Sequence, residues 1–147
     1  MDERRVAGIV YNETSGIRAG SAGDAVLSAA REKIAQIAIA RNGQGVAAPK
    51  IPNAQELRYP PARAAWDDSL AAARRAVGQD PGTCRHFVLW PSGDGQSPTE
   101  SPRMRAGWPY SEASKIGHRY GPFQVPLKVG DVPAGENIYI FVYCGVR

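Results

Sequence analysis

Residues 24–43 read DAVLSAAREKIAQIAIARNG, and this stretch decides the fold of the N-terminal half. Asp24 is a favoured residue at the start of a helix, and Asn42-Gly43 is typical of a helix end. Between them, apolar residues recur at the helical period: Leu27, Ala30, Ile34, Ile37 and Ala38. The stretch therefore predicts a helix from Ala25 to about Arg41. Because it is apolar over much of its circumference, we expect it near the centre of the core.

Two further helices are predicted on either side of this one. Residues 3–14 carry apolar residues at helical spacing, and Ser15-Gly16 is a plausible stop. Residues 64–77 show the same spacing, with Trp66, Leu70, Ala73 and Val77 on one face. Residues 45–63 carry four prolines and no clear period, so they predict a connector.

The C-terminal half has the composition of strands. Residues 84–90, 123–129 and 137–143 are rich in aromatic and branched residues and predict three strands, the last two joined by a hairpin loop. Residues 91–109 are rich in Ser, Gly and Pro and predict a long surface loop. With 147 residues, the sequence predicts a single α+β domain, a helical core with a small antiparallel sheet.

Composition and charge exclude several classes of protein. The content of apolar and charged residues is that of a globular domain. No stretch approaches the 18 or so apolar residues of a membrane span, and the N-terminus has no apolar signal-peptide segment. The net charge of +4 favours anionic partners, although the basic residues are scattered and serve solubility equally well.

The chain has two cysteines, Cys84 and Cys144, and no CxxC motif. They are too few for a structural zinc site on their own. We expect them on neighbouring strands of the sheet. A disulfide and two buried thiols are equally compatible with the sequence.

Glu13 is the unusual residue of the first predicted helix. It continues the apolar face of Val6, Ile9 and Val10, where a hydrophobic residue is expected. A carboxyl group in an apolar environment has a raised pKa, because burial disfavours its charged form. Such an acid can protonate the leaving oxygen of a glycosidic bond. The alternative is a helix-end glutamate that simply points to water.

The surroundings of Glu13 resemble a known family. Residues 10–16, VYNETSG, resemble the glutamate-centred motif of cell-wall hydrolases of the spore-cortex-lytic type. The family's helix of small and aliphatic residues corresponds to 25–42. Its later helix, Asp-Pro turn and aromatic strand correspond to 66–77, Asp80-Pro81 and His86-Phe87. The Glu-Thr-Ser-Gly string is also similar to the motif of lytic transglycosylases, which share a lysozyme-like core.

The resemblance implies a lysozyme-like helical core and a peptidoglycan-cleaving glycosidase, either a muramidase or a lytic transglycosylase. Glu13 would be its general acid and base, with no cofactor and no metal. Local structure accounts for four aspartates: Asp24 is expected as a cap, Asp80 in a turn, and Asp67 and Asp68 in the first turn of the third helix. A single-glutamate mechanism follows, in which the substrate's own hydroxyl or N-acetyl group completes the reaction.

Candidate substrate-binding residues surround this glutamate in sequence or flank the long loop. Aromatic rings stack on the apolar faces of sugars, but structural packing is the alternative for each of them. The candidates are Tyr11, Ser15, His86, Phe87, Trp108, Tyr110 and Tyr120.

The expected partner is the peptidoglycan glycan strand, with an immunity or delivery protein as a further candidate and no nucleic acid. Without a signal peptide, the periplasm or cell wall would be reached by another route, as for an antibacterial toxin or a lysin. Two other functions stay open. One is a non-catalytic glycan-binding module, and the other is a basic metal-independent nuclease toxin using His86 and His118.

Overall fold

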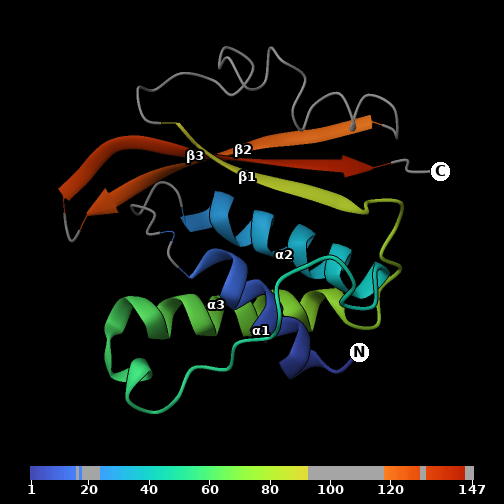
Figure 1. Ribbon diagram of the computed structural model, residues 1–147, viewed down its shortest axis with the longest axis horizontal. Coiled ribbons are helices and arrows are strands. Elements are labelled where there is room, and N and C mark those ends of the chain that lie inside the picture. The colour runs from blue at the N-terminus through green and yellow to red at the C-terminus, as the bar shows by residue number, and fades with distance from the viewer. Residues whose placement is uncertain (16, 18–23, 93–117, 130–131, 145–147) are drawn as a thin grey trace. The chain divides into compact units, whose positions relative to one another are not determined.

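The computed structural model describes residues 1–15, 17, 24–92, 118–129 and 132–144 (Figure 1). The chain divides into two compact units. The first comprises Met1–Arg18 and Ser28–Gly82, and the second comprises Ala19–Leu27 and Thr83–Arg147. The first unit contains the described helices, except for the first four residues of the second helix, Asp24–Leu27. The three strands belong to the second unit.

Helix α1 spans Glu3–Thr14, which confirms the predicted bounds. Its N-cap is Asp2, whose side chain accepts a hydrogen bond from the Arg5 backbone N–H at 2.8 Å. Its C-cap is Ser15, whose N–H donates to the Tyr11 carbonyl. The middle of α1 is buried all round, from Val6 to Tyr11. This helix is therefore enclosed by other parts of the first unit rather than lying on its surface.

Helix α2 spans Asp24–Ala40 and ends as the sequence predicts. Asn42 and Gly43 both have positive φ, at 50° and 75°, and the Gly43 N–H donates to the Ala38 carbonyl at 2.9 Å. This left-handed turn satisfies a carbonyl group that the helix end leaves without a partner.

Helix α3 spans Pro60–Ala76 and begins four residues before the predicted start. Pro60 and Pro61 occupy its first turn, where the missing N–H of proline costs no hydrogen bond. The buried face is also rotated from the predicted one, because Leu70 and Val77 are only half-buried. The side chains that this helix buries are mostly small: Ala65, Trp66, Ser69, Ala72, Ala73 and Ala76.

The connector between α2 and α3 packs against α1, with one short 3-10 helix, η1, at Glu56–Arg58. The Lys50 N–H donates to the Gly8 carbonyl at 3.0 Å. A Cβ at Gly8 would lie 3.1 Å from the Pro49 Cβ and 3.2 Å from the Lys50 nitrogen. The glycine in the middle of α1 therefore permits this close approach of the connector, which crosses α1 in Figure 1.

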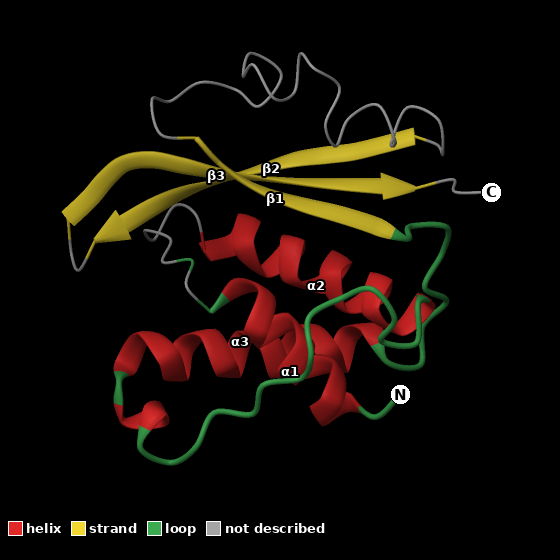
Figure 2. Ribbon diagram, in the orientation of Figure 1, coloured by secondary structure: helices red, strands yellow, loops and turns green. Residues whose placement is uncertain are grey.

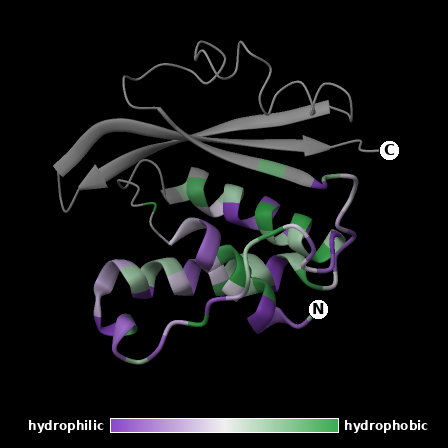
Figure 3. Ribbon diagram, in the orientation of Figure 1, coloured by the Kyte–Doolittle hydropathy of each residue, from purple (hydrophilic) through white to green (hydrophobic). Residues whose placement is uncertain are grey.

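The core of the first unit is made by helices. Figure 2 shows only helices and loops along this part of the chain, and Figure 3 shows hydrophobic residues in the central turns of the helices. Among residues whose side chains are described, the buried apolar ones lie in α1, α2 and α3, apart from Ile17, Pro52 and Cys84. The helices thus bury one another's apolar faces.

In the second unit the backbone pairing defines three strands: β1 (His86–Ser92), β2 (His118–Val129) and β3 (Val132–Cys144). Their order is β1-β3-β2, and both pairs are antiparallel. β2 begins five residues before the predicted strand 123–129, and β3 begins five residues before the predicted strand 137–143. Of the predicted loop 91–109, Pro91 and Ser92 belong to β1, and the remainder lies outside the described residues.

The predicted fold class, an α+β domain with a lysozyme-like helical core and a small antiparallel sheet, is wrong. The part of the chain with described packing is a helical unit, and no described strand belongs to it. The physical reason is that alanine-rich faces let helices approach closely and cover one another. The apolar faces of the three helices are therefore buried mainly against one another.

Candidate functional site

Glu13 lies at the C-terminal end of α1 and is half-buried. Its Oε1 accepts a hydrogen bond from the backbone N–H of Ala47 at 2.8 Å. The neighbouring Asn12 donates from Nδ2 to the Ala48 carbonyl at 2.8 Å. Two adjacent side chains of the helix are therefore bonded to two adjacent residues of the connector.

The apolar face of α1 does not continue into Glu13. It continues from Val10 to Thr14, which is 0% exposed. The Thr14 hydroxyl donates to the Val10 carbonyl at 2.7 Å and accepts from Nε of Arg31 at 2.9 Å. The buried polar residue at this helix end is thus Thr14, which the sequence pattern did not single out.

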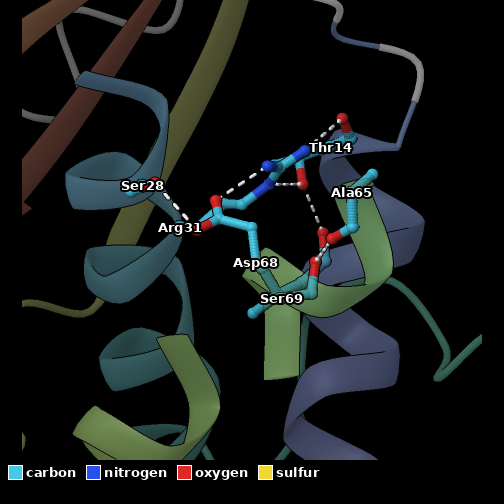
Figure 4. A network of polar contacts seen from close by, with 7 residues as sticks. Thr14, Ser28, Arg31, Ala65, Asp68 and Ser69 are labelled. Atoms are coloured by element: carbon cyan, nitrogen blue, oxygen red, sulfur yellow. Dashed lines mark hydrogen bonds and ion pairs between the residues drawn. The ribbon is translucent and has the colours of Figure 1, made fainter. Parts of the chain in front are cut away.

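Arg31 of α2 connects the C-terminal end of α1 to the middle of α3 (Figure 4). The residue is 4% exposed, and among the described residues it is the only charged one that is buried. Its Nη1 lies 2.8 Å from Oδ2 of Asp68, and Ser28 donates its hydroxyl to the other oxygen of that carboxylate at 2.8 Å. A buried guanidinium requires such partners, because removing a charge from water is costly.

The prediction that Asp67 and Asp68 lie in the first turn of the third helix is wrong. α3 begins at Pro60, so both aspartates lie in its middle, and Asp68 is the partner of Arg31. A sequence signal for this pair did exist. Arg31 falls on the apolar face of residues 24–43, between Leu27 and Ile34, where a charged residue needs a partner.

Tyr11 and Ser15, two predicted substrate-binding residues, have structural partners near Glu13. Tyr11 is 3% exposed and packs edge-on against Trp66, with ring centroids 5.6 Å apart and planes at 89°. Lys50 Nζ lies 6.0 Å from the centroid of the Tyr11 ring. Ser15 caps α1 through its backbone. In this arrangement Tyr11 offers a ligand almost no surface.

The environment of Tyr11 predicts a loss of stability in alkaline solution. Burial, with a smaller contribution from the negative charge of Glu56, raises the pKa of Tyr11 above the ordinary 10.0. Above pH 10 the unfolded chain therefore loses this proton more readily than the folded one, so the free energy of unfolding falls as pH rises toward the folded pKa. Tyr11→Phe should remove this part of the decline in urea titrations from pH 8 to 11. An identical decline in Tyr11→Phe, with exposed Tyr59→Phe as control, would contradict the assignment.

The remaining candidate residues lie in the second unit or outside the described residues. His86 pairs with Tyr143, Phe87 pairs with Val142, and Tyr120 pairs with that same Val142. Phe87 and Tyr120 therefore occupy the same register position on either side of β3, and the backbone of His86 is one position away. Trp108 and Tyr110 lie outside the described residues.

Cys84 is disulfide-bonded and 7% exposed, and Cys144 is the only other cysteine of the chain. Cys84 lies two residues before β1, and Cys144 is the last residue of β3. His86 and Tyr143 are opposite each other at this end of the two strands. The backbone therefore places the two cysteines at the same end of neighbouring strands.

Loss of the disulfide is expected to destabilise the second unit strongly. A bond between Cys84 and Cys144 closes a loop of about 60 residues, for which the chain-entropy model gives about 4 kcal/mol. Cys84→Ser should lower the free energy of unfolding by roughly that amount in chemical denaturation. A reductant should have the same effect on the wild type and none on the variant. Equal stability of the oxidised and reduced wild type would contradict the expectation.

Other functional groups are sparse in the described part of the chain. There, no group of three or more His, Cys, Asp and Glu side chains is arranged to hold a metal ion. Asp80 forms the predicted turn, since its carboxylate accepts from the Gly82 N–H at 2.9 Å. None of the helices in the described ranges has the length and apolar character needed to cross a membrane.

Comparison of the chain with protein-family models, with curated proteins and with solved structures finds no match.

Proposed function

We propose that this chain cleaves the glycan strand of peptidoglycan, with Glu13 as the general acid and base. The observation that supports the proposal is the partial burial of the Glu13 carboxylate and its hydrogen bond to the backbone. Glu13 is half-buried at the end of an enclosed helix, and the Ala47 N–H fixes one of its oxygens at 2.8 Å. An acid that is held in place yet partly exposed can be oriented toward a glycosidic oxygen.

Two of the other acidic residues considered from the sequence, Asp68 and Asp80, have structural partners. Asp68 is bound by Arg31 and Ser28, and Asp80 forms a turn. This favours the single-glutamate mechanism, in which Glu13 protonates the leaving oxygen and the substrate's own hydroxyl or N-acetyl group attacks the anomeric carbon. The proposal depends on the site and not on a lysozyme-like fold, because unrelated folds can carry the same chemistry.

The disulfide at Cys84 supports an oxidising setting such as the periplasm or cell wall. The net charge of +4 suits an anionic polymer. These two properties fit an antibacterial effector or a lysin that acts on the wall, with an immunity or delivery protein as a further partner.

A non-catalytic glycan-binding module is the second candidate. The bond between Glu13 and Ala47 favours it, because this bond alone gives the carboxylate a structural role. In such a module Glu13 would fasten the connector to α1 and take part in no reaction.

The two functions differ in their products. The oxidised protein would be incubated with purified peptidoglycan, and the soluble fragments would be identified by mass spectrometry. A glycosidase is expected to release either fragments with new reducing ends or anhydro fragments lighter by one water. Binding to the insoluble polymer without any release would favour the module and overturn the enzyme. Neither binding nor release would overturn both.

A further inference from the structure

The buried charge of the helical unit is located next to the proposed acid. Arg31 is 4% exposed, and its guanidinium reaches the last residue of α1. Nε donates to the Thr14 hydroxyl at 2.9 Å, and Nη2 lies 3.4 Å from the Thr14 carbonyl oxygen. One arginine thus holds both the side chain and the backbone of the residue that follows Glu13.

Arg31 is itself held in place from the opposite side. Asp68 of α3 binds its Nη1 at 2.8 Å, and Ser28, one turn earlier on α2, donates to the same carboxylate. Figure 4 shows these side chains converging between the three helices. Since planar arginine forms several directed hydrogen bonds at once, its orientation is well defined by such a set of partners.

The connector holds the end of α1 from its other side. Glu13 accepts from the Ala47 N–H, and Asn12 donates to the Ala48 carbonyl. Consecutive residues 12, 13 and 14 therefore each have a tertiary hydrogen bond. The two oxygens of Thr14 and the carboxylate of Glu13 are fixed from different directions by α2 and by the connector.

Stability alone is a weak reason for this buried pair. Replacing a buried ion pair with well-packed apolar residues of similar volume is often neutral or stabilising. A role in fixing the geometry of a neighbouring group accounts for its position better. Catalytic groups lose much of their efficiency when they are displaced by as little as 1 Å or so.

We propose that Arg31 is a positioning residue for Glu13, which it orients through Thr14. The inference rests on the proposed glycosidase function. In this role Arg31 touches no substrate. It restrains the backbone at the end of α1, so that the Glu13 carboxylate stays bonded to the Ala47 N–H and keeps one orientation.

Arg31→Met is the main test, because methionine fills part of the space and removes the donors. It should lower kcat on peptidoglycan by up to about 100-fold while KM changes little. Hydrogen exchange at the Ala47 amide should become about tenfold faster, the factor expected when one hydrogen bond is weakened. Arg31→Lys, which keeps the charge and some donors, should restore part of both effects. Arg75→Met makes the same change at an exposed pair with Glu32 and should alter neither.

The outcomes separate this inference from the proposed function. Unchanged Ala47 exchange and unchanged kcat in folded Arg31→Met would overturn the inference. If the wild type releases no fragments, the proposed function fails, while Ala47 exchange still decides whether Arg31 holds Glu13. If Arg31→Met does not fold, Thr14→Val provides a second test, because it removes the hydroxyl that accepts from Nε of Arg31 at 2.9 Å and leaves only the longer contact to the backbone carbonyl and the Asp68 pair. Unchanged Ala47 exchange in that variant would equally overturn the inference.

Discussion

Replacing Asp68 with alanine is expected to lower the free energy of unfolding of the helical unit by about 3 kcal/mol. The substitution removes the carboxylate that lies 2.8 Å from Nη1 of Arg31 and leaves that guanidinium buried. An uncompensated buried charge is among the most destabilising changes known for a protein core. Because the Asp68 side chain is 24% exposed, water replaces it in part, so the lower end of the usual range is expected.

The adjacent Asp67 provides a matched control, because it lies on the exposed side of the same helical turn. Asp67→Ala should change the free energy of unfolding by no more than about 0.5 kcal/mol in urea titrations. The double variant Arg31→Met/Asp68→Leu should recover most of the loss, since it removes both charges together. If Asp68→Ala costs no more than Asp67→Ala, the pair does not stabilise the helical arrangement.

The helices were the most predictable part of the fold, because their signals are local. Asp2 and Ser15 are the caps at the two ends of α1, and Asn42-Gly43 terminates α2. Each of these boundaries is therefore set by residues within one turn of it. The start of α3 was missed for an equally local reason. Pro60-Pro61 resembles a helix breaker in a sequence, although proline is favoured in the first turn.

The partners of the candidate site could not be predicted by the same reasoning. Periodicity places Arg31 on an apolar face, but it does not reveal that Asp68, 37 residues later, supplies the opposite charge. A long arginine side chain can also reach water from such a face, so its burial is a tertiary property. Likewise, the connector that bonds to Glu13 through Ala47 shows no period of its own, and its course depends on the space above Gly8.

Glu13 shows how far a sequence pattern can lead. The spacing of Val6, Ile9 and Val10 correctly indicated a buried face, but that face continues into Thr14, one residue further on. The difference of one position is about 100° around a helix. Because of this difference, Glu13 is half-buried and bonded to the connector, and it is not a core residue. In this position the same carboxylate can have a structural role or a catalytic one.

Glu13→Gln is expected to separate these two roles. The glutamine carbonyl can still accept the hydrogen bond from the Ala47 N–H, so the free energy of unfolding should stay within about 0.5 kcal/mol of wild type. Glutamine has no acidic proton to transfer to a leaving oxygen. Release of fragments from peptidoglycan should therefore fall by at least about 100-fold, the lower end of general acid–base contributions.

Glu13→Ala completes the comparison, because alanine removes the acid and the hydrogen bond together. Its free energy of unfolding should fall by about 1–2 kcal/mol, since the half-buried Ala47 N–H loses a carboxylate acceptor. A catalytic Glu13 predicts that both variants are inactive and that only the alanine variant is destabilised. A purely structural Glu13 predicts that the glutamine variant keeps its activity as well as its stability. Thermal or urea unfolding and the fragment assay, run on the same preparations, distinguish the two patterns. Wild-type activity in folded Glu13→Gln would end the assignment of this residue as the acid.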